Sequence, residues 1–522
     1  MRKSAIVHGI GHLLLPVIAA LFTTSASASL SGETLAQQGG GSVPACMSCH
    51  GAQGEGNPAA GFPALAGLSS AYLVKQLHDL ANGSRQNAIM GPMAKGLTDA
   101  QIQAVASYYS GLKPTSAASG QGDKALLAEG RELAVNGQWN QAMPACVKCH
   151  GAGARGVDPV FPSLAGQHAS YLANQLKAWQ QGQRHNDPSG VMATVAEKLN
   201  DQQIQAVAAY LAALPVEGEV PASAQPDIAP AQADGMTGYF QPPLKKDLPD
   251  GKFGESVSRG ANIFNHTHLD PEASQYVGNG QDCSNCHVNG GRQANAAPMW
   301  AAWVRYPMYR GKNDTVNTMA ERLRGCFTYS ENAPGSAKGK PPAADSQVLV
   351  DLMSYMYWQA AGAPTGQKMK GQGYPKLAEP AKPYSAERGK QVFAENCAMC
   401  HGDNGQGTLQ AKNDYVFPPI WGPHAFNWGA GMHRVNTAAG FIKANMPLGN
   451  PGSLSVQQAW DVAAYIDSKP RPQDPRFDGN LEETIKAFHN NRKIDFYGQT
   501  VDGYSLGAPG TLEKWMQDHD IN

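Results

Sequence analysis

The sequence predicts an all-α protein of four small domains in tandem, arranged as two halves. The pattern C-x-x-C-H occurs four times, and an amphipathic helical pattern follows each copy. The first half of the chain also contains an internal repeat, and 522 residues suit three or four domains at roughly 100–200 residues each. The four copies are CMSCH (46–50), CVKCH (146–150), CSNCH (283–287) and CAMCH (397–401).

The internal repeat covers two complete units of the first half. PACMSCHGAQGEG recurs as PACVKCHGAGARG, and each unit ends in a helical pattern, at 97–112 and at 199–214. Thr98 and Gln101 predict a capping box, and apolar residues follow at i, i+3, i+4 and i+7. Similar apolar stripes stand behind Ser346 and Ser455. One such stripe indicates only core packing, but its regular placement after every motif predicts four helical domains.

The C-x-x-C-H pattern is typical of covalent attachment of a c-type haem. Two cysteines three residues apart face the same way on a helical turn, and the histidine that follows binds the iron. Structural zinc and thioredoxin-like sites also use C-x-x-C pairs, but neither requires the histidine. We therefore expect four haems c, attached to Cys46, Cys49, Cys146, Cys149, Cys283, Cys286, Cys397 and Cys400 and ligated by His50, His150, His287 and His401.

The expected domains are class I cytochrome c domains in two di-haem halves. They span 31–115, 122–216, 251–365 and 385–470. Residues 217–250 are rich in proline and alanine and predict an extended linker, and a shorter one at 366–385 separates the last two domains. We expect the C-terminal tail, 471–522, to wrap over the last domain, with a weak helix near Leu481–Phe488.

The N-terminus predicts export. Residues 1–28 combine basic Arg2 and Lys3, a short apolar run and a small-residue Ala26-Ser27-Ala28 step, as a secretory signal peptide does. The alternative, an uncleaved membrane anchor, needs about 20 apolar residues, and this run is interrupted at Gly11, His12 and Pro16. We expect a periplasmic mature protein without a membrane span. A formal charge of −1 argues against a nucleic-acid partner.

Three methionines occupy equivalent positions after their motifs. Met90 follows His50 by 40 residues, Met192 follows His150 by 42, and Met446 follows His401 by 45. Each lies seven or eight residues before the leucine that opens the terminal helix, which makes core methionines the weaker interpretation. Methionine ligation raises the potential of a haem, as an electron carrier requires. We expect these three residues to be distal ligands, with Met93 as the nearest rival to Met90.

The third domain has a cysteine near the equivalent position. Cys326 is the ninth cysteine and follows His287 by 39 residues. An unpaired thiol is unusual in an exported protein, although a buried free thiol is the plainer alternative. We expect Cys326 to be the distal ligand of the third haem, where its thiolate would lower the potential relative to methionine.

Basic residues surround Cys326 in the sequence. Arg322 and Ser330 share its helical face at i−4 and i+4. The 305–326 stretch contains five cations against Asp314 and Glu321, so it would attract a small anion. We take Arg322 as the substrate-binding residue. We interpret Arg305 and Arg324 as surface charges or as partners for haem propionates.

Residues 250–522 resemble the thiosulfate dehydrogenases, which are tetrathionate-forming di-haem cytochromes. The resemblance is carried by CSNCHVNGGRQANAAPMWAAWVRYPMYRGKND, ERLRGCFTYSEN, FPPIWGPHAFNWGAGMHR, AAGFIKANMPLG and DVAAYIDSKPRP. Residues 31–215 resemble tandem di-haem cytochromes of the c4 type, including the electron acceptor of those enzymes. The chain is thus similar to a fusion of acceptor and enzyme.

This resemblance implies an activity and a set of residues. It implies oxidation of two thiosulfate ions to tetrathionate with Cys326 as distal ligand, Arg322 and Ser330 in the active site, and either Arg310 or Lys312 as a further basic residue. It also implies ligation of the fourth haem at Asn445-Met446-Pro447. The asparagine stands where some members have lysine, so a lysine/methionine ligand exchange is not available in that form. A downstream soluble cytochrome or terminal oxidase would accept the electrons.

Two alternatives remain at this stage. A non-catalytic multi-haem electron-transfer cytochrome would account for the haems and methionines but not for Cys326 among cations. A sulfur-carrier cytochrome would instead load thiosulfate onto a cysteine of another protein. Tetrathionate reduction, the reverse reaction, would use the same site.

Overall fold

The computed structural model describes residues 1, 31–115, 123–187, 189–232, 237–311 and 314–521. The signal peptide expected at 1–28 therefore lies outside the described residues, except for Met1. Lys312 also lies outside them. Helices dominate, and the strands of the described part form three two-stranded antiparallel pairs. The all-α prediction is confirmed. No helix among the described residues is long and apolar enough to cross a membrane.

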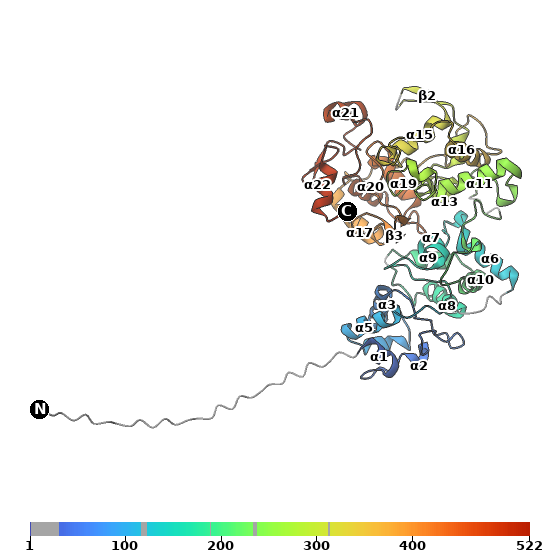
Figure 1. Ribbon diagram of the computed structural model, residues 1–522, viewed down its shortest axis with the longest axis vertical. Helices are drawn as coiled ribbons and strands as arrows, with labels where there is room; N and C mark the ends of the chain where they lie inside the picture. Colours follow the sequence, from blue (N-terminus) through green and yellow to red (C-terminus); the bar gives the residue numbers. More distant parts are fainter. Residues whose placement is uncertain (2–30, 116–122, 188, 233–236, 312–313, 522) are drawn as a thin grey trace.

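The first half of the chain contains two similar helical units (Figure 1). The helices of the first are α1 (Gly32–Gln38), α2 (Met47–His50), α3 (Ser70–Asn82), α4 (Met90–Lys95) and α5 (Asp99–Ser110). Those of the second are α6 (Lys124–Arg131), a π-helical turn (Glu132–Asn136), short 3-10 turns (Trp139–Gln141, Ala152–Ala154), α7 (Val147–His150), α8 (Ala169–Gln180), α9 (Val191–Glu197) and α10 (Asp201–Ala212).

The second half contains two larger units. Its third motif lies among α11 (Gly251–Asn265), α12 (Cys283–Cys286), α13 (Val288–Gly291), α14 (Met299–Trp303), the hairpin β1 (Met308–Arg310) and β2 (Thr315–Asn317), α15 (Met319–Tyr329) and α16 (Gln347–Gln359), with 3-10 turns at Ala273–Tyr276 and Ala333–Gly335. Its fourth lies among α17 (Ala386–Asn396), α18 (Ala398–His401), the hairpin β3 (Thr408–Ala411) and β4 (Asp414–Phe417), a 3-10 turn (Gly431–His433), α19 (Val435–Asn445) and α20 (Val456–Asp467).

The terminal helices begin where the sequence predicts. Thr98 caps α5 in a capping box with Gln101, and the buried face of α5 is Ile102, Val105, Ala106 and Tyr109. Asn200 and Gln203 repeat the box on α10, and Ser455 and Gln458 repeat it on α20. Ser346 caps α16 by accepting a hydrogen bond from the amide of Leu349. The polar caps satisfy amides that the first turn leaves unpaired.

The same close helix crossing occurs in all four units. The first helix of each unit places a glycine directly against the backbone of the last helix. A Cβ added there would lie 1.9–2.0 Å from a carbonyl oxygen, at Gly32 against Ala104, Gly130 against Ala206, Gly260 against Asp351 and Gly389 against Asp461. A tyrosine four residues after each of these carbonyls packs beside the glycine: Tyr108, Tyr210, Tyr355 and Tyr465.

The segments outside the four units are docked on them. Asp227, in the linker predicted at 217–250, pairs with Arg131 and Lys245, and Ala229 is buried in the core of the third unit. The linker is therefore held against both halves, because it contributes buried alanines and ion pairs that proline and alanine content alone does not reveal.

The C-terminal tail packs on the fourth unit. It contains α21 (Leu481–Phe488), the hairpin β5 (Thr500–Val501) and β6 (Tyr504–Ser505), and α22 (Thr511–Asp518). Trp515 of α22 joins the core formed by α17, α19 and α20. Tyr497 and Leu506 make a second, small core with Trp428.

The helix crossing gives a test of packing. Gly389→Ala should destabilise the fourth unit by about 1–3 kcal/mol or more, because the methyl group and the Asp461 carbonyl cannot occupy the same space. Denaturant titration followed by circular dichroism measures the change. Gly373→Ala is the matched control, since a Cβ there meets nothing within 4 Å. Equal stability of the two variants would contradict the close crossing.

Candidate haem crevices and substrate site

Each motif histidine is oriented by a backbone carbonyl. The Nδ1 atoms of His50, His150, His287 and His401 lie 2.8–3.0 Å from the carbonyl oxygens of Pro63, Pro162, Ala297 and Pro418. Donation of Nδ1–H to a carbonyl fixes the tautomer and leaves the Nε2 lone pair free for a metal. Burial also lowers the pKa of each of these histidines, to about 4 at His287, so the rings are neutral as iron ligands must be.

An aromatic side chain packs on each of these rings. Phe62, Phe161 and Phe417 each precede the proline whose carbonyl accepts the hydrogen bond, and their centroids lie 6.0–6.4 Å from the histidine rings. Phe264 of α11 takes this position beside His287, at 6.2 Å. The Phe-Pro dipeptide is thus a local signal of the histidine support that sequence reasoning missed.

The motif cysteines form no disulfides. None of the nine cysteines, all within the described residues, is in a disulfide. Burial raises the pKa of Cys146 to about 11 and that of Cys397 to about 12. Half-buried cysteines without disulfide partners, beside a neutral histidine, fit covalent haem at every motif.

The fourth crevice contains its predicted distal ligand. Cys397, Cys400, His401 and Met446 line one largely apolar pocket. Met446 ends α19, and its amide donates to the carbonyl of Ile442 at 2.9 Å. The donor set therefore fits a haem held between His401 and Met446.

The other two methionines stand at the beginning of short helices. Met90 is the first residue of α4, and Met192 is the second residue of α9. Their amides receive the same local support, from Asn87 Oδ1 and Asp187 Oδ2, each at 2.8 Å. Met90 and its rival Met93 are both partly buried, so the choice between them stays a prediction.

Cys326 lies with Arg322 at the third motif. Both are on α15, which begins at a capping box of Thr318 and Glu321. The pKa of Arg322 is raised, first of all by the Coulombic interaction with Cys326, against the opposite effect of burial. Cys326 also adds to the pKa of Cys286, which burial raises to about 12, and Arg322 helps to lower that of His287. Cys326 and Arg322 therefore lie close enough to each other and to the third motif to influence the pKa values of its residues.

The remaining predicted site residues surround the end of α15. Ser330 caps the helix, and its amide donates to the Cys326 carbonyl at 2.8 Å. Arg310, at the end of β1, acts with Arg476 to lower the pKa of Tyr329 against the larger opposite effect of burial. Arg305 and Arg324 are exposed, and Arg324 Nε donates to the Pro342 carbonyl at 3.1 Å.

Tyr374 is a site residue that the sequence analysis missed. It lies in the segment predicted as a spacer between the third and fourth domains. Its hydroxyl donates to the Cys286 carbonyl at 3.3 Å, and its ring packs edge-on against Phe441. Burial raises the pKa of Tyr374, and the charges of Arg322 and Cys326 also act on it. Only the fold reveals this, because no periodic pattern marks the segment.

The second and fourth motifs meet across the two halves. The rings of Phe161 and Phe417, each packed on its motif histidine, lie 5.2 Å apart. The amide of Ala152 donates to Gln410 Oε1 at 3.0 Å, and Lys198 Nζ donates to the Gly449 carbonyl at 3.2 Å. An aromatic contact therefore joins the surroundings of the two predicted haems.

Comparison with known proteins agrees with this arrangement. The cytochrome c family model matches residues 31–113, 127–215 and 386–469, which contain the first, second and fourth motifs. A thiosulfate dehydrogenase of Stutzerimonas stutzeri is 54% identical over 270 residues, covering 52% of this chain and 85% of that protein. A thiosulfate dehydrogenase electron acceptor of Thiomonas intermedia is 51% identical over 180 residues, covering 34% and 83%. The solved structure of thiosulfate dehydrogenase TsdBA from Marichromatium purpuratum matches with a TM-score of 0.82 and 48% identity, over 91% of this chain and 98% of that one.

Substitution of Met446 tests the fourth crevice. Met446→Gly should shift the spectrum and lower the potential of one haem, because a thioether ligand is lost. The end of α19 should be kept, since the hydrogen bond there is made by the backbone amide of residue 446 to the Ile442 carbonyl. Potentiometry with optical detection measures the spectrum and the potential. An unchanged haem would point to one of the two histidines between His401 and Met446, His424 and His433. Of these His424 is the candidate, since both ring nitrogens of His433 contact Ala430 and Asp495.

Proposed function

Because the chain belongs to the thiosulfate dehydrogenase family, we propose that it oxidises two thiosulfate ions to one tetrathionate ion and two electrons in the periplasm. The observation that carries the proposal is the placement of Cys326 and Arg322 together at the third motif. A pure electron carrier has no use for a cysteine and an arginine side by side at this position.

Four covalent haems c are part of the proposal. His50/Met90, His150/Met192, His287/Cys326 and His401/Met446 would hold the four irons. When bound, haem supplies one-electron acceptors, with a lower potential at the cysteine-ligated centre than at the methionine-ligated ones. The electrons would leave through the methionine-ligated centres to a soluble cytochrome or terminal oxidase.

The first task of the site is to hold an anion. Thiosulfate is a dianion, and two such ions must approach each other, so cations are needed to offset their repulsion. Arg322 offers a planar guanidinium beside the Cys326 sulfur, and Arg310 of β1 lies near the end of the same helix. The one acidic residue in the first turn of α15, Glu321, is engaged in capping Thr318. Arg322 and Arg310 are the described cations that would offset the charge of the two anions.

Cys326 would supply the nucleophilic sulfur when it is released from its role as distal ligand. Its thiolate forms a bond to the outer sulfur of the first thiosulfate, and two electrons leave the pair of sulfur atoms for the one-electron acceptors that haem would supply at the third and fourth motifs, which gives a cysteine S-thiosulfonate. The outer sulfur of a second thiosulfate then attacks the same atom. The new S–S bond completes tetrathionate, and the Cys326 thiolate is the leaving group, so no proton is consumed. A covalent route of this kind divides one difficult step into two.

Ser330 and Tyr374 would position the substrate. Ser330 is one turn after Cys326 on the same helical face, where its hydroxyl would donate to a sulfonate oxygen. Tyr374 closes the site from the segment between the third and fourth motifs. Tetrathionate reduction would use the same residues in reverse order.

Loss of the nucleophile tests the proposal directly. Thiosulfate added to the oxidised wild-type protein should reduce it, with one tetrathionate formed per two electrons. Cys326→Gly should lose nearly all of this activity and one thiolate-type haem signature. It should keep its attached haems, because the eight motif cysteines remain. Haem content and reduction by dithionite are the controls. Near-normal turnover by Cys326→Gly would reduce this residue to a buried thiol.

Removal of the cation should affect substrate use rather than the haem. Arg322→Ala should lower kcat/KM for thiosulfate by about 10- to 100-fold, which corresponds to the loss of one charged hydrogen bond of about 1.5–3 kcal/mol. The thiolate spectrum should persist. Arg324→Ala, an exposed arginine on the same helix, is the matched control and should leave kcat/KM nearly unchanged. Equal effects of the two substitutions would point to net charge instead of a specific contact.

A further inference from the structure

Two histidines and an aspartate converge in the interior of the C-terminal region, away from the motifs. His433, His489 and Asp495 each offer one ligand atom, and these atoms all lie within 4.8 Å of one another. His433 Nε2 is 2.9 Å and His489 Nδ1 is 2.8 Å from the same atom, Asp495 Oδ2. The three side chains are buried, with exposures of 1–3%. We call them the His433–His489–Asp495 cluster.

The contacts of this cluster cannot all be hydrogen bonds if both histidine rings are neutral and no metal ion is bound. All four ring nitrogens face oxygen acceptors: Ala430 and Asp495 for His433, and Asp495 and Asp474 for His489. A neutral ring has one N–H, and an ionised carboxylate only accepts. Satisfying every contact would require two buried cationic rings, with centroids 5.0 Å apart, directed at one carboxylate oxygen. Like charges this close are unfavourable where water is absent.

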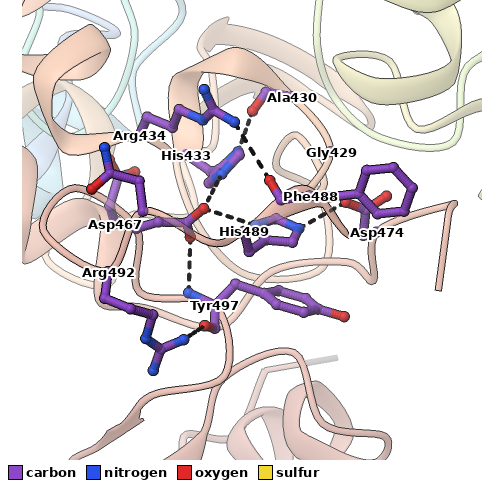
Figure 2. Close-up of polar contacts among 12 residues, drawn as sticks. Gly429, Ala430, His433, Arg434, Asp467, Asp474, Phe488, His489, Arg492 and Tyr497 are labelled. Atoms are coloured by element: carbon purple, nitrogen blue, oxygen red, sulfur yellow. Dashed lines mark hydrogen bonds and ion pairs between the residues drawn. The ribbon is translucent and has the colours of Figure 1, made fainter. Parts of the chain in front are cut away.

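A divalent metal ion would resolve the conflict. With a cation between His433 Nε2, His489 Nδ1 and Asp495 Oδ2, each ring stays neutral and keeps one proton. His433 gives its Nδ1 proton to the Ala430 carbonyl, and His489 gives its Nε2 proton to Asp474, as Figure 2 shows for these contacts. Histidine ligands of metals commonly donate their second N–H in this way, to a carbonyl or a carboxylate.

We propose that the His433–His489–Asp495 cluster is a structural site for one divalent transition-metal ion of the zinc type. Two imidazoles and a carboxylate are ligands that zinc accepts, and the fourth tetrahedral position would be left for a water molecule. Bonds of about 2.0–2.1 Å place tetrahedral ligands about 3.3 Å apart, so the two histidine nitrogens that contact Asp495 Oδ2 would each move about 0.5 Å away from that oxygen.

The position of the cluster indicates what the ion would do. His433 belongs to the fourth unit, whereas His489, Asp495 and Asp474 belong to the C-terminal tail. The tail also reaches the end of α15: the Arg476 guanidinium pairs with Asp474 and lies 5.3 Å from the centroid of the Tyr329 ring. A bound ion would therefore fasten the tail to the fourth unit, close to the helix that carries Cys326.

Metal content of the intact protein tests the proposal. The purified haem-containing protein is equilibrated with zinc at neutral pH, passed over a chelating resin and measured by mass spectrometry for zinc per chain. The wild type should retain about one zinc, and His433→Gln should retain little, because one of three protein ligands is lost. His519→Gln is the matched control: this tail histidine contacts the carbonyl of Trp515, outside the cluster, and its substitution should not change zinc retention.

A second measurement avoids dependence on the variant. The midpoint of thermal unfolding of the wild type should rise with the logarithm of free zinc concentration and should not respond to magnesium, because only the folded chain assembles the three ligands. A wild type that retains no zinc overturns the proposal, and so does His433→Gln that retains as much as the wild type. In either case the cluster is a protonated polar network.

Discussion

The contact between a glycine in the first helix and a carbonyl in the last helix of each unit is the constraint on which the structure depends. At Gly32, Gly130, Gly260 and Gly389 the two backbones approach so closely that a methyl group does not fit. The motif follows the first helix, and the segment with the distal candidate precedes the last one. Their crossing therefore brings the two segments together at one crevice. Because the frame is fixed by backbone contact, the chemistry of each crevice can vary between the two helices without disturbing it.

The third unit uses this freedom. The other three place a methionine at the beginning of a short helix or at the end of one, at Met90, Met192 and Met446. The third instead places α15 between the motif and the last helix, with Cys326 and Arg322 one turn apart. In a chain with a formal charge of −1, a local excess of arginine beside a sulfur atom favours a small anion. We propose that the same helical frame supports electron carriage in the first, second and fourth units and sulfur chemistry in the third.

Sequence patterns predicted the features that depend on residues close together in the chain. Capping boxes and 3.6-residue periodicity identified the terminal helices, and motif spacing placed Met446 in a pocket with His401. Contacts between distant segments were not predictable in this way. The glycine crossings join residues 72 to 91 positions apart, and His433 meets Asp495 across 62 positions. Tyr374 and Asp227 lie in segments whose composition indicates linkers, yet their side chains are fixed by partners elsewhere in the fold. Lys312, the alternative to Arg310, lies outside the described residues.

The docked linker and the contact between halves have a kinetic consequence for the proposed function. Separate enzyme and acceptor proteins must meet by diffusion before each transfer, and the rate then depends on concentration and salt. In this chain Phe161 and Phe417 are in contact, and Asp227 holds the linker on the second unit through Arg131. No diffusive encounter is needed, because the two halves of the chain are always in contact, which corresponds to a very high effective concentration. Two electrons released at Cys326 could then move from the third and fourth motifs toward the second without any docking step. The first unit, joined to the second through Gln167 and the backbone of Ala64, would be left to meet the external acceptor.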